Sequence, residues 1–384
     1  MQFKAIITKA GLVGLALFVL LICVAFLVVH LLSIKSEEEI PIKYEEEVSV
    51  TISHEVMYQN PLKINNIGDP FVLKASDGKY YCYSTSAYDG YLVWTSEDLV
   101  NWESKGHAYR TDYTSWAGSD FWAPEVYEHN GRYIMFYSAR WQENGSLRIG
   151  TAVSSSPLGP FTDTKNEPMF DFGYAVIDAN VLIDGDKNYL FYSRDCSENI
   201  VDGRPESHIY GVELSDDLLS IKGEPVLLLK PDQDWEFKSG GYLWNEAPFS
   251  FAHNGKYYLM YSANFYGDMT YSVGYATASS PLGVYVKSEE NPILESVPKP
   301  AKADEDDIAL AEISGPGHNC VTTSPDGSEF FVVYHTHMDS FIAGGDRQVC
   351  IDRMTFDEDG SIHINGPTMS PQPFPSGAAT PQTP

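Results

Sequence analysis

The sequence is poor in basic residues. Lys and Arg together number 25, against 53 Asp and Glu, which leaves a formal net charge of -28 at pH 7. A surface of that sign repels nucleic acid phosphates and anionic lipid head groups. We therefore expect no nucleic acid partner, and a ligand that is neutral or cationic.

Cysteine is also scarce, and no Cys-x-x-Cys pair occurs. The chain has five cysteines in 384 residues, one of them Cys23 in an apolar run and the others far apart. Without a closely spaced pair we predict no zinc site. Disulfides are most needed by small domains that lack a core, so we expect none with functional weight here.

Helical periodicity is almost absent between residues 59 and 370. This region instead alternates aromatic or β-branched residues with polar ones, and Gly, Asn, Asp and Ser-Pro turns interrupt it. The chain has 25 Tyr, 19 Phe and 7 Trp, enough to bury a large core. The pattern predicts one all-β domain over residues 59–370.

A single long apolar run, residues 10–29, follows Lys4 and Lys9. Its length suits a membrane-spanning helix, and the basic residues before it favour a cytoplasmic N-terminus. A cleaved signal peptide, with secretion of the rest, is the alternative, but no A-x-A-like cleavage site is evident. We favour residues 1–35 as a cytoplasmic N-terminus and single-pass anchor in the cell membrane, with the remainder outside the cell.

Two segments flank the predicted domain. Residues 36–58 contain two Glu triplets and suit a solvated acidic linker better than a metal site. Residues 371–384 are Pro-rich and predict a loose tail.

An aromatic strand motif, such as GKYYLMYS, recurs five times inside the domain. Its last Tyr occurs as Tyr83, Tyr137, Tyr192, Tyr261 and Tyr334, at intervals of 54, 55, 69 and 73 residues. Units of this length suit four antiparallel strands each. Radial repetition of such sheets predicts a five-bladed β-propeller, with a sandwich or solenoid as the alternative.

A polar residue precedes each repeated Tyr by 12 to 16 positions. These residues are Asp69, Glu125, Asp178, Glu246 and His318. If each opens the innermost strand of its blade, all five lie in the same register and converge at one end of the axis. Taken singly, each has a structural interpretation: Asp69 as a turn residue, Asp178 as a backbone cap, Glu125 as an Arg partner and His318 as a packed core residue.

Carboxylates gathered at one place raise one another's pKa, so crowding them is costly. A ring of residues with a purely structural role would have little reason to keep such carboxylates. Hydrolysis of a glycosidic bond requires one protonated and one ionised carboxyl group. Glu246 lies among Trp244, Ala247 and Pro248, so it has the more desolvating neighbours and is the candidate acid. Asp69 has more polar neighbours and is the candidate ionised group.

At these motifs, over about residues 60–367, the sequence resembles glycoside hydrolase family 43, whose members are five-bladed propellers. The resemblance implies that Asp69 of GDPF is the general base and Glu246 of NEAPF the general acid. Asp178 of IDANV would orient the acid and tune its pKa. The family inverts the anomeric centre, which places its two carboxyl groups about 6.5 to 9.5 Å apart. Ala247 stands where many members have Gly.

The resemblance also extends to His318 and Arg347. His318 matches an axial histidine that helps to hold calcium or a hydrated cation in many members, although the chemistry itself requires no cofactor. Arg347 matches an arginine that contacts the sugar and lowers the pKa of nearby carboxylates. Among the aromatic residues near the motifs, Trp122 is the strongest candidate for a sugar platform. The further candidates are Phe121 and Trp244 beside the motifs and Trp116, Tyr174 and Phe265 on loops.

We therefore predict an inverting glycoside hydrolase that releases terminal α-L-arabinofuranosyl or β-D-xylosyl groups from plant polysaccharide fragments. An endo-acting arabinanase is the alternative within the family; residues 195–208 predict a long loop that would narrow its cleft. A non-catalytic sugar-binding propeller is the alternative of another class, but it has no use for a separated acid and base. A retaining fructan-type hydrolase would require an NDPNG-like motif, and only GDPF is present.

Overall fold

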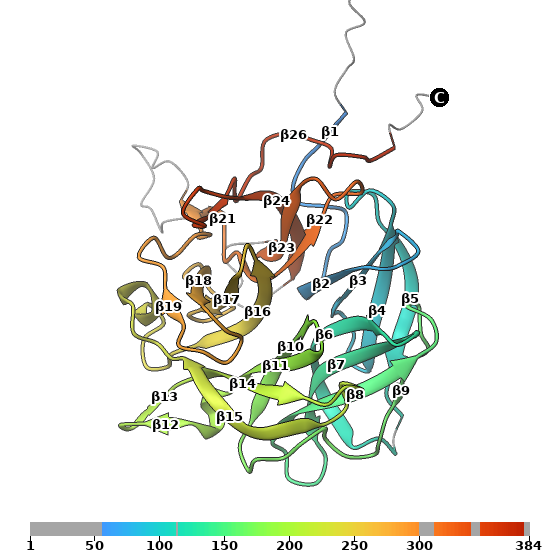
Figure 1. The fold of residues 1–384 in the computed structure, drawn as a ribbon, viewed down its shortest axis with the longest axis vertical. Coiled ribbons are helices and arrows are strands. Elements are labelled where there is room, and N and C mark those ends of the chain that lie inside the picture. Colours follow the sequence, from blue (N-terminus) through green and yellow to red (C-terminus); the bar gives the residue numbers. More distant parts are fainter. Residues whose placement is uncertain (1–55, 113, 299–310, 339–345, 380–384) are drawn as a thin grey trace, which may run out of the picture. The chain divides into compact units, whose positions relative to one another are not determined.

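The computed structural model describes residues 56–112, 114–298, 311–338 and 346–379. Within them, five four-stranded antiparallel sheets stand around a common axis (Figure 1). The predicted all-β, five-bladed propeller is confirmed. Each sheet is one blade, and the blades follow the order of the chain.

In every blade the strands follow the chain from the axis outward. Blade 1 is β2 (Gly68–Lys74), β3 (Tyr80–Thr85), β4 (Gly90–Ser96) and β5 (Glu103–Arg110). Blade 2 is β6 (Ala117–His129), β7 (Arg132–Trp141), β8 (Leu147–Ser154) and β9 (Thr162–Asp163). Blade 3 is β10 (Val176–Asp184), β11 (Lys187–Arg194), β14 (His208–Leu214) and β15 (Ile221–Leu229).

The last two blades have the same organisation. Blade 4 is β16 (Asn245–His253), β17 (Lys256–Ala263), β18 (Ser272–Ala278) and β19 (Val286–Lys287). Blade 5 is β22 (Gly317–Thr323), β23 (Phe330–His337), β24 (Arg347–Phe356) and β25 (Ile362–Ile364).

Local turn chemistry sets the inner hairpins of blades 2 and 4. Asn130-Gly131 joins β6 to β7, and Asn254-Gly255 joins β16 to β17; all four residues have positive φ. Two central residues in this conformation match the twist of a tight hairpin, and Asn-Gly adopts it at the lowest cost. The repeated Tyr of every blade lies on the second strand and is fully buried.

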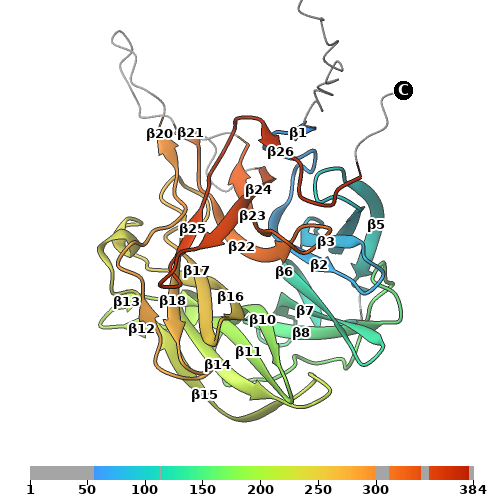
Figure 2. The ribbon, with the colours of Figure 1, turned by 45° about the horizontal axis from the view of Figure 1, so that its top comes forward.

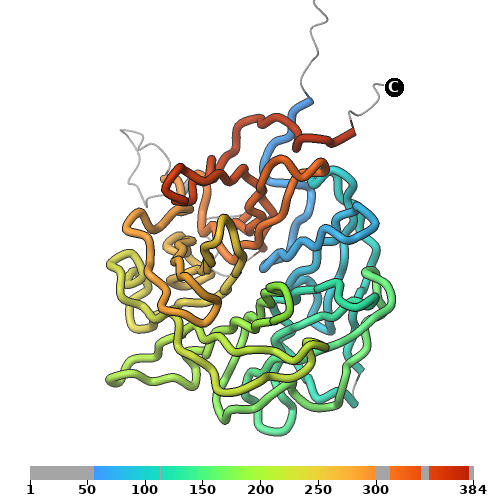
Figure 3. Tube along the Cα trace, in the orientation of Figure 1, coloured from blue at the N-terminus to red at the C-terminus, as the bar shows by residue number. Residues whose placement is uncertain are grey.

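The ring closes between the first and last blades. The innermost strands contact one another in sequence, β2 with β6, β6 with β10, β10 with β16, β16 with β22, and β22 again with β2. Figure 3 shows the blue start of the propeller beside its orange and red end. The Leu62 N–H donates to the Val349 carbonyl at 2.8 Å, and the side chain of Asn60 bonds the backbone of Ile351 in β24 in both directions. Backbone pairing across the seam thus joins segments from opposite ends of the domain.

The segment predicted as a loose Pro-rich tail is partly ordered. Strand β26 (Gln372–Pro373) pairs with β1 (Met57–Tyr58), and the Phe374 ring meets the Tyr58 ring edge-on at 6.3 Å. The Ser376 N–H also donates to the Glu329 carboxylate at 2.7 Å. Composition indicated a loose tail because it reports local preference only, whereas these contacts come from residues far away in the sequence, at the start of the domain and in blade 5.

Several short elements lie outside the five four-stranded sheets. They are η2 (Cys196–Glu198), the hairpin of β12 (Ile200–Val201) and β13 (Arg204–Pro205), η3 (Asp234–Phe237), and the pair β20 (Val297–Pro298) and β21 (Ala311–Ile313) (Figure 2). Residues 195–208, predicted as a long loop, therefore contain a helical turn and a hairpin. The Asp202-Gly203 pair closes this hairpin with positive φ at both residues.

The predicted membrane segment of residues 1–35, and the acidic linker up to residue 55, lie outside the described residues. From residue 56 onward, within the described ranges, no helix has the length and apolar character that crossing a membrane requires. The anchor therefore stays a prediction. Cys82, Cys196, Cys320 and Cys350 are buried free thiols.

Candidate active site

A pocket of about 320 Å³ lies at the axis and collects all six predicted site residues. Its volume is at the lower end of the range of about 300 to 1,000 Å³ usual for small-molecule sites. The predicted residues in its wall are Asp69, Trp122, Asp178, Glu246, His318 and Arg347. The convergence predicted from the repeats is therefore observed: three carboxyl groups, the His318 imidazole and the Arg347 guanidinium line the same pocket.

A β-bulge in each innermost strand aims these side chains. The pairing register shifts after Gly68, Trp122, Ile177, Glu246 and Gly317, and β6 has two further shifts nearer its start. The residue that directly follows each of these five positions has positive φ. These residues are Asp69, Ala123, Asp178, Ala247 and His318. Left-handed backbone is unfavourable for residues other than Gly and marks sites where tertiary structure holds a side chain in place.

The bulges correct the predicted register. Asp69, Asp178 and His318 occupy the same bulge position, but Glu246 precedes its bulge and Glu125 follows one. Glu125 is absent from the pocket wall and is buried between blades, where Tyr127 and Asn180 donate to its Oε2. Burial raises the pKa of Glu125 to about 8. The prediction that all five polar residues share one register was wrong because counting residues cannot detect a bulge.

In three of the five blades, the residue that ends the preceding repeat holds the bulge; in blade 2 the acceptor is Thr85, one residue beyond the repeat, which accepts the Ala123 N–H. Ser138 accepts the N–H of Asp178, Ser262 accepts that of His318, and His335 Nδ1 accepts that of Asp69, at 2.8 to 3.1 Å. A bulge leaves an N–H without a partner in the sheet, and a buried N–H without a partner is costly. The repeated motif thus supplies a side-chain acceptor where the backbone requires one.

Blade 4 departs from this arrangement, and Asp178 takes the acceptor's place. Its Oδ2 accepts the N–H of Ala247 at 2.9 Å, while Ser193 donates instead to the Asn245 carbonyl. Ala247 directly follows Glu246. Asp178 therefore holds the backbone that carries the candidate acid, which is the geometry expected of an orienting residue.

Asp69 is surrounded by groups that favour its ionised form. Its Oδ1 accepts from Arg347 at 2.7 Å and lies 3.2 Å from His318 Nδ1, and Thr85 donates to its Oδ2 at 2.5 Å. Burial by itself would raise the pKa of Asp69, but the Arg347 charge, the two nearby imidazoles and the Thr85 hydroxyl together lower it well below its usual value. Arg347 reaches this position because Gly68 has no Cβ, which would lie within 2 Å of the guanidinium.

Glu246 has the opposite environment. No cation pairs with it in the described residues, and burial together with the negative charge of Asp178 raises its pKa well above its usual value. The Tyr271 hydroxyl donates to its Oε1 at 2.9 Å and opposes part of this shift. Asp195, which lies in the pocket wall, adds a further raising charge. One carboxyl group is thus held ionised and the other protonated within a single pocket.

Several residues of this site were not predicted. Tyr271, Thr85 and Asp195 contact or polarise the carboxylates, and none belongs to the aligned motif positions. Tyr271 stacks on His335, with ring centroids 5.7 Å apart. One signal in the sequence could have found some of them: Thr85 and His335 lie at or directly after the end of a repeated motif.

The residues around His318 do not fit a directly coordinated calcium ion. Calcium takes about six to eight oxygen ligands, and among the described residues no group of three or more His, Cys, Asp or Glu could hold a metal. His318 offers a nitrogen, and its carboxylate neighbour Asp69 already binds Arg347. A hydrated cation there remains a prediction, and no step of the chemistry below depends on it.

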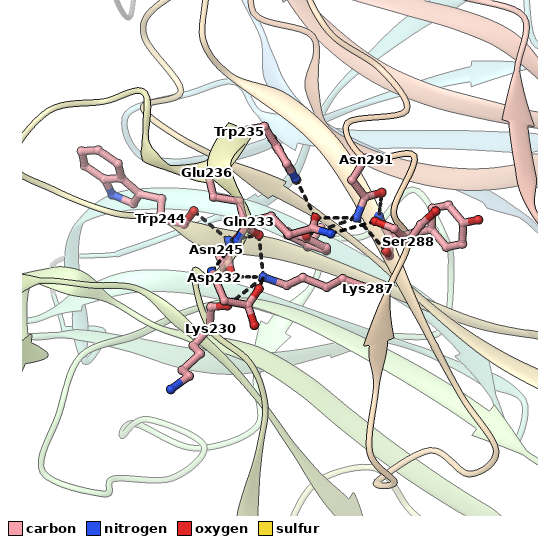
Figure 4. A network of polar contacts seen from close by, with 12 residues as sticks. Lys230, Asp232, Gln233, Trp235, Glu236, Trp244, Asn245, Lys287, Ser288 and Asn291 are labelled. Atoms are coloured by element: carbon pink, nitrogen blue, oxygen red, sulfur yellow. Dashed lines mark hydrogen bonds and ion pairs between the residues drawn. The ribbon is translucent and has the colours of Figure 1, made fainter.

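A buried ion pair supports the segment before Glu246 (Figure 4). Lys287 Nζ lies 2.6 Å from Glu236 Oε1, and both side chains are almost completely shielded from solvent. The same carboxylate accepts from the side chain of Asn245 at 3.0 Å and from the backbone N–H groups of Asp232 and Gln233. The pair therefore fixes Asn245, the neighbour of Glu246 in β16.

Lys287→Met should lower the free energy of unfolding by about 3 to 5 kcal/mol, because it leaves the buried Glu236 carboxylate without its cation. Urea denaturation followed by fluorescence measures the change. Lys187→Met is the matched control, since its pair with Glu213 is exposed and its loss should leave stability nearly unchanged. Equal effects of the two substitutions would contradict a structural role for the buried pair.

Tyr271→Phe should move the basic limb of the pH profile of kcat/KM to higher pH. The hydroxyl stabilises the ionised form of Glu246, so its removal raises the pKa of this acid and keeps it protonated to higher pH. The value of kcat/KM at the optimum should fall by less than about tenfold, the usual range for one hydrogen bond. A limb that stays in place, or moves to lower pH, would show that Glu246 does not control it.

Comparison with known proteins decides the family. The model of glycosyl hydrolases family 43 matches residues 58–362, most of the chain and nearly the whole propeller. The chain belongs to this family.

Proteins similar to this family 43 chain are named for different activities. A crystal structure of a thermostable family 43 glycoside hydrolase is 50% identical, with a TM-score of 0.77, over 84% of this chain and 100% of that one. Beta-D-galactofuranosidase xynD of Aspergillus niger is 27% identical over 83% of this chain and 88% of its own length. An extracellular exo-alpha-(1->5)-L-arabinofuranosidase of Streptomyces chartreusis is 28% identical over 75% and 84%.

Proposed function

We propose that the chain is an inverting, exo-acting glycosidase that releases terminal α-L-arabinofuranosyl or β-D-xylosyl groups from arabinose- or xylose-containing glycans. The observation that carries the proposal is the opposed environment of two carboxyl groups in one pocket. Asp69 is paired with Arg347, whereas Glu246 is buried beside Asp178 without a cation. Membership of family 43 supports glycoside hydrolysis as the reaction class.

In the proposed reaction Glu246 gives its proton to the glycosidic oxygen while the bond from this oxygen to the anomeric carbon breaks. A water molecule attacks the opposite face of that carbon and loses a proton to Asp69. The products are a free sugar of inverted configuration and a leaving group with a new hydroxyl. Asp69 then loses its proton to solvent, and Glu246 takes up a proton from solvent.

The other pocket residues have supporting roles. Arg347 keeps Asp69 ionised and lies where it can donate to sugar hydroxyls, and His318 borders the same carboxylate. Asp178 holds the Glu246 segment through the Ala247 N–H. Trp122 offers the apolar ring against which one sugar face packs.

The names of relatives support a pentose or another furanose in the pocket. They include the exo-acting arabinofuranosidase and the galactofuranosidase above, and a xylosidase/arabinosidase of Bacteroides ovatus that is 30% identical over 57% of this chain. The small pocket favours one terminal sugar unit. Endo action is the alternative within the family.

A panel of nitrophenyl glycosides tests this proposal. We expect hydrolysis of the α-L-arabinofuranoside, the β-D-xyloside or both, and the β-D-galactofuranoside is included because of the Aspergillus relative. Proton NMR of the first product formed should show the inverted anomer. Inactivity on every glycoside would favour a sugar-binding propeller, and a retained anomer would refute the roles given to Asp69 and water.

We further propose that the propeller is held outside the cell membrane by the apolar run of residues 10–29. Expression in the native host followed by membrane fractionation tests this. A protein that stays in the membrane pellet after alkaline washing is expected, whereas release into the medium would favour the cleaved signal peptide.

A further inference from the structure

Four aromatic rings form a continuous line at the rim of the pocket. Tyr242 stacks on Trp244 with centroids 5.6 Å apart and planes 17° from parallel. Trp244 lies 5.5 Å from Phe265, which lies 5.0 Å from Tyr266. We call these four residues the rim aromatics.

The rim aromatics connect the pocket with the outer surface. Trp244, Phe265 and Tyr266 line the pocket together with Glu246, and Arg347 lies over the Tyr266 ring at 5.1 Å. Tyr242 is outside the pocket wall and 50% exposed. Its ring is not isolated, because it stacks on Trp244 and so extends a row of rings that lines the pocket beside the candidate acid.

The backbone beneath these rings is held firmly. Figure 4 shows the Trp244 indole pointing away from the buried network, while the Asn245 side chain donates to the Trp244 carbonyl at 3.1 Å. The Phe265 N–H donates to Ser239 Oγ at 2.7 Å. A platform whose rings are already in place loses little conformational freedom when a ligand binds.

The position of Glu246 decides which part of a substrate meets the rim aromatics. The acid must reach the glycosidic oxygen, and atoms beyond that oxygen belong to the leaving group. Trp244 is two residues from Glu246, so the Trp244–Tyr242 end of the row leads outward from the acid's side, whereas Tyr266 at the other end contacts Arg347. A second cavity, of about 550 Å³, lies instead beside Gly68 and Arg347 on the Asp69 side, and the exposed Tyr88 borders it.

We infer that Trp244 and Tyr242, the outer end of the rim aromatics, bind the leaving group as a chain of at least two neutral sugar units, an inference that rests on the proposed function. Neutral sugars present apolar faces that pack on aromatic rings. The net charge of -28 disfavours chains rich in uronic acids. The substrate is therefore an oligosaccharide or polysaccharide that continues past the scissile bond across Trp244 to Tyr242.

Chain-length dependence tests this inference. The values of kcat/KM are measured on a nitrophenyl pentoside and on arabino- and xylo-oligosaccharides of two to six units. Tyr242→Ala should lower the ratio of oligosaccharide to nitrophenyl kcat/KM by about 3- to 10-fold, the range typical of one aromatic contact, and only for chains of three or more units. Tyr242→Phe should restore the ratio.

Tyr88→Ala is the matched control, since it removes an exposed tyrosine from the other side of the pocket and should leave the ratio unchanged. An unchanged ratio in Tyr242→Ala would overturn the inference, as would a chain-length effect confined to Tyr88→Ala. Equal losses on both substrate types would also overturn it, by indicating a general structural effect.

A binding measurement separates this inference from the proposed function. Trp fluorescence of a Glu246→Gln protein, titrated with the same oligosaccharides, requires no turnover. We expect an oligosaccharide of three units to bind more tightly than one of two units. This gain in affinity should disappear when Tyr242→Ala is combined with Glu246→Gln. Wild-type inactivity on all pentosides would refute the proposed function, whereas affinity independent of chain length would refute the inference alone.

Discussion

Asp69→Asn should lower kcat by about 10³-fold on every substrate, whatever its leaving group, because general base catalysis contributes about 10² to 10⁴ in rate. The amide keeps the size of the side chain and can still accept from Arg347, but it cannot remove a proton from water. Asp69 is ionised over the whole working range because Arg347 lowers its pKa, so no part of the pH profile should restore activity. Initial rates on nitrophenyl and oligosaccharide substrates measure the loss.

Asp352→Asn is the control for this substitution. Asp352 is a buried carboxyl of blade 5 that bonds Tyr334 and Thr368 and is absent from the pocket wall. It should change kcat by less than about threefold, since it contributes no catalytic proton transfer. Full activity of the Asp69→Asn protein would refute its assignment as the base.

Glu246→Gln should have an effect that depends on the leaving group. Sugar alkoxides leave poorly without a proton, so kcat/KM on oligosaccharides should fall by about 10² to 10⁴. A dinitrophenolate leaves without protonation, and the loss on a dinitrophenyl pentoside should be at least tenfold smaller. The basic limb of the pH profile should also disappear, because the group whose raised pKa causes it is gone.

Glu125→Gln is the matched control for the acid. Both glutamates lie on innermost strands and have a raised pKa through burial, but only Glu246 lines the pocket. Glu125→Gln should therefore change kcat/KM on the oligosaccharides and on the dinitrophenyl pentoside to the same extent. Equal losses on oligosaccharide and dinitrophenyl substrate in Glu246→Gln would remove Glu246 from the role of acid.

The candidate site was predictable to the extent that the blades repeat. Asp69, Asp178 and Glu246 stand at similar distances before a repeated Tyr, and this alone predicted that they meet at one end of the axis. Glu125 stands at a similar distance and does not reach the pocket. One bulge separates the two outcomes, and its place depends on pairing with the neighbouring strand rather than on residue type.

Trp244 and Phe265 were candidates for the sugar platform, but Tyr271 and the continuous row of the rim aromatics could not be predicted, for a different reason. Tyr271 reaches Glu246 from a residue next to the third strand of its blade, and the ring fits only because Gly317 in blade 5 has no side chain there. Phe265 and Trp244 are 21 residues apart, and Tyr242 becomes part of the row only through stacking. Such neighbours share no sequence period that would reveal them.

The sequence by itself determined the class and number of the repeating units, because strand periodicity, turn residues and buried aromatics act over short distances along the chain. Sequence neighbours made Glu246 the candidate acid and Asp69 the candidate ionised group, but only the tertiary structure supplied the charges and the burial that separate their pKa values. The pKa of each group depends on burial and on charges from other blades, such as Arg347 beside Asp69, and these distances exist only after the ring has closed.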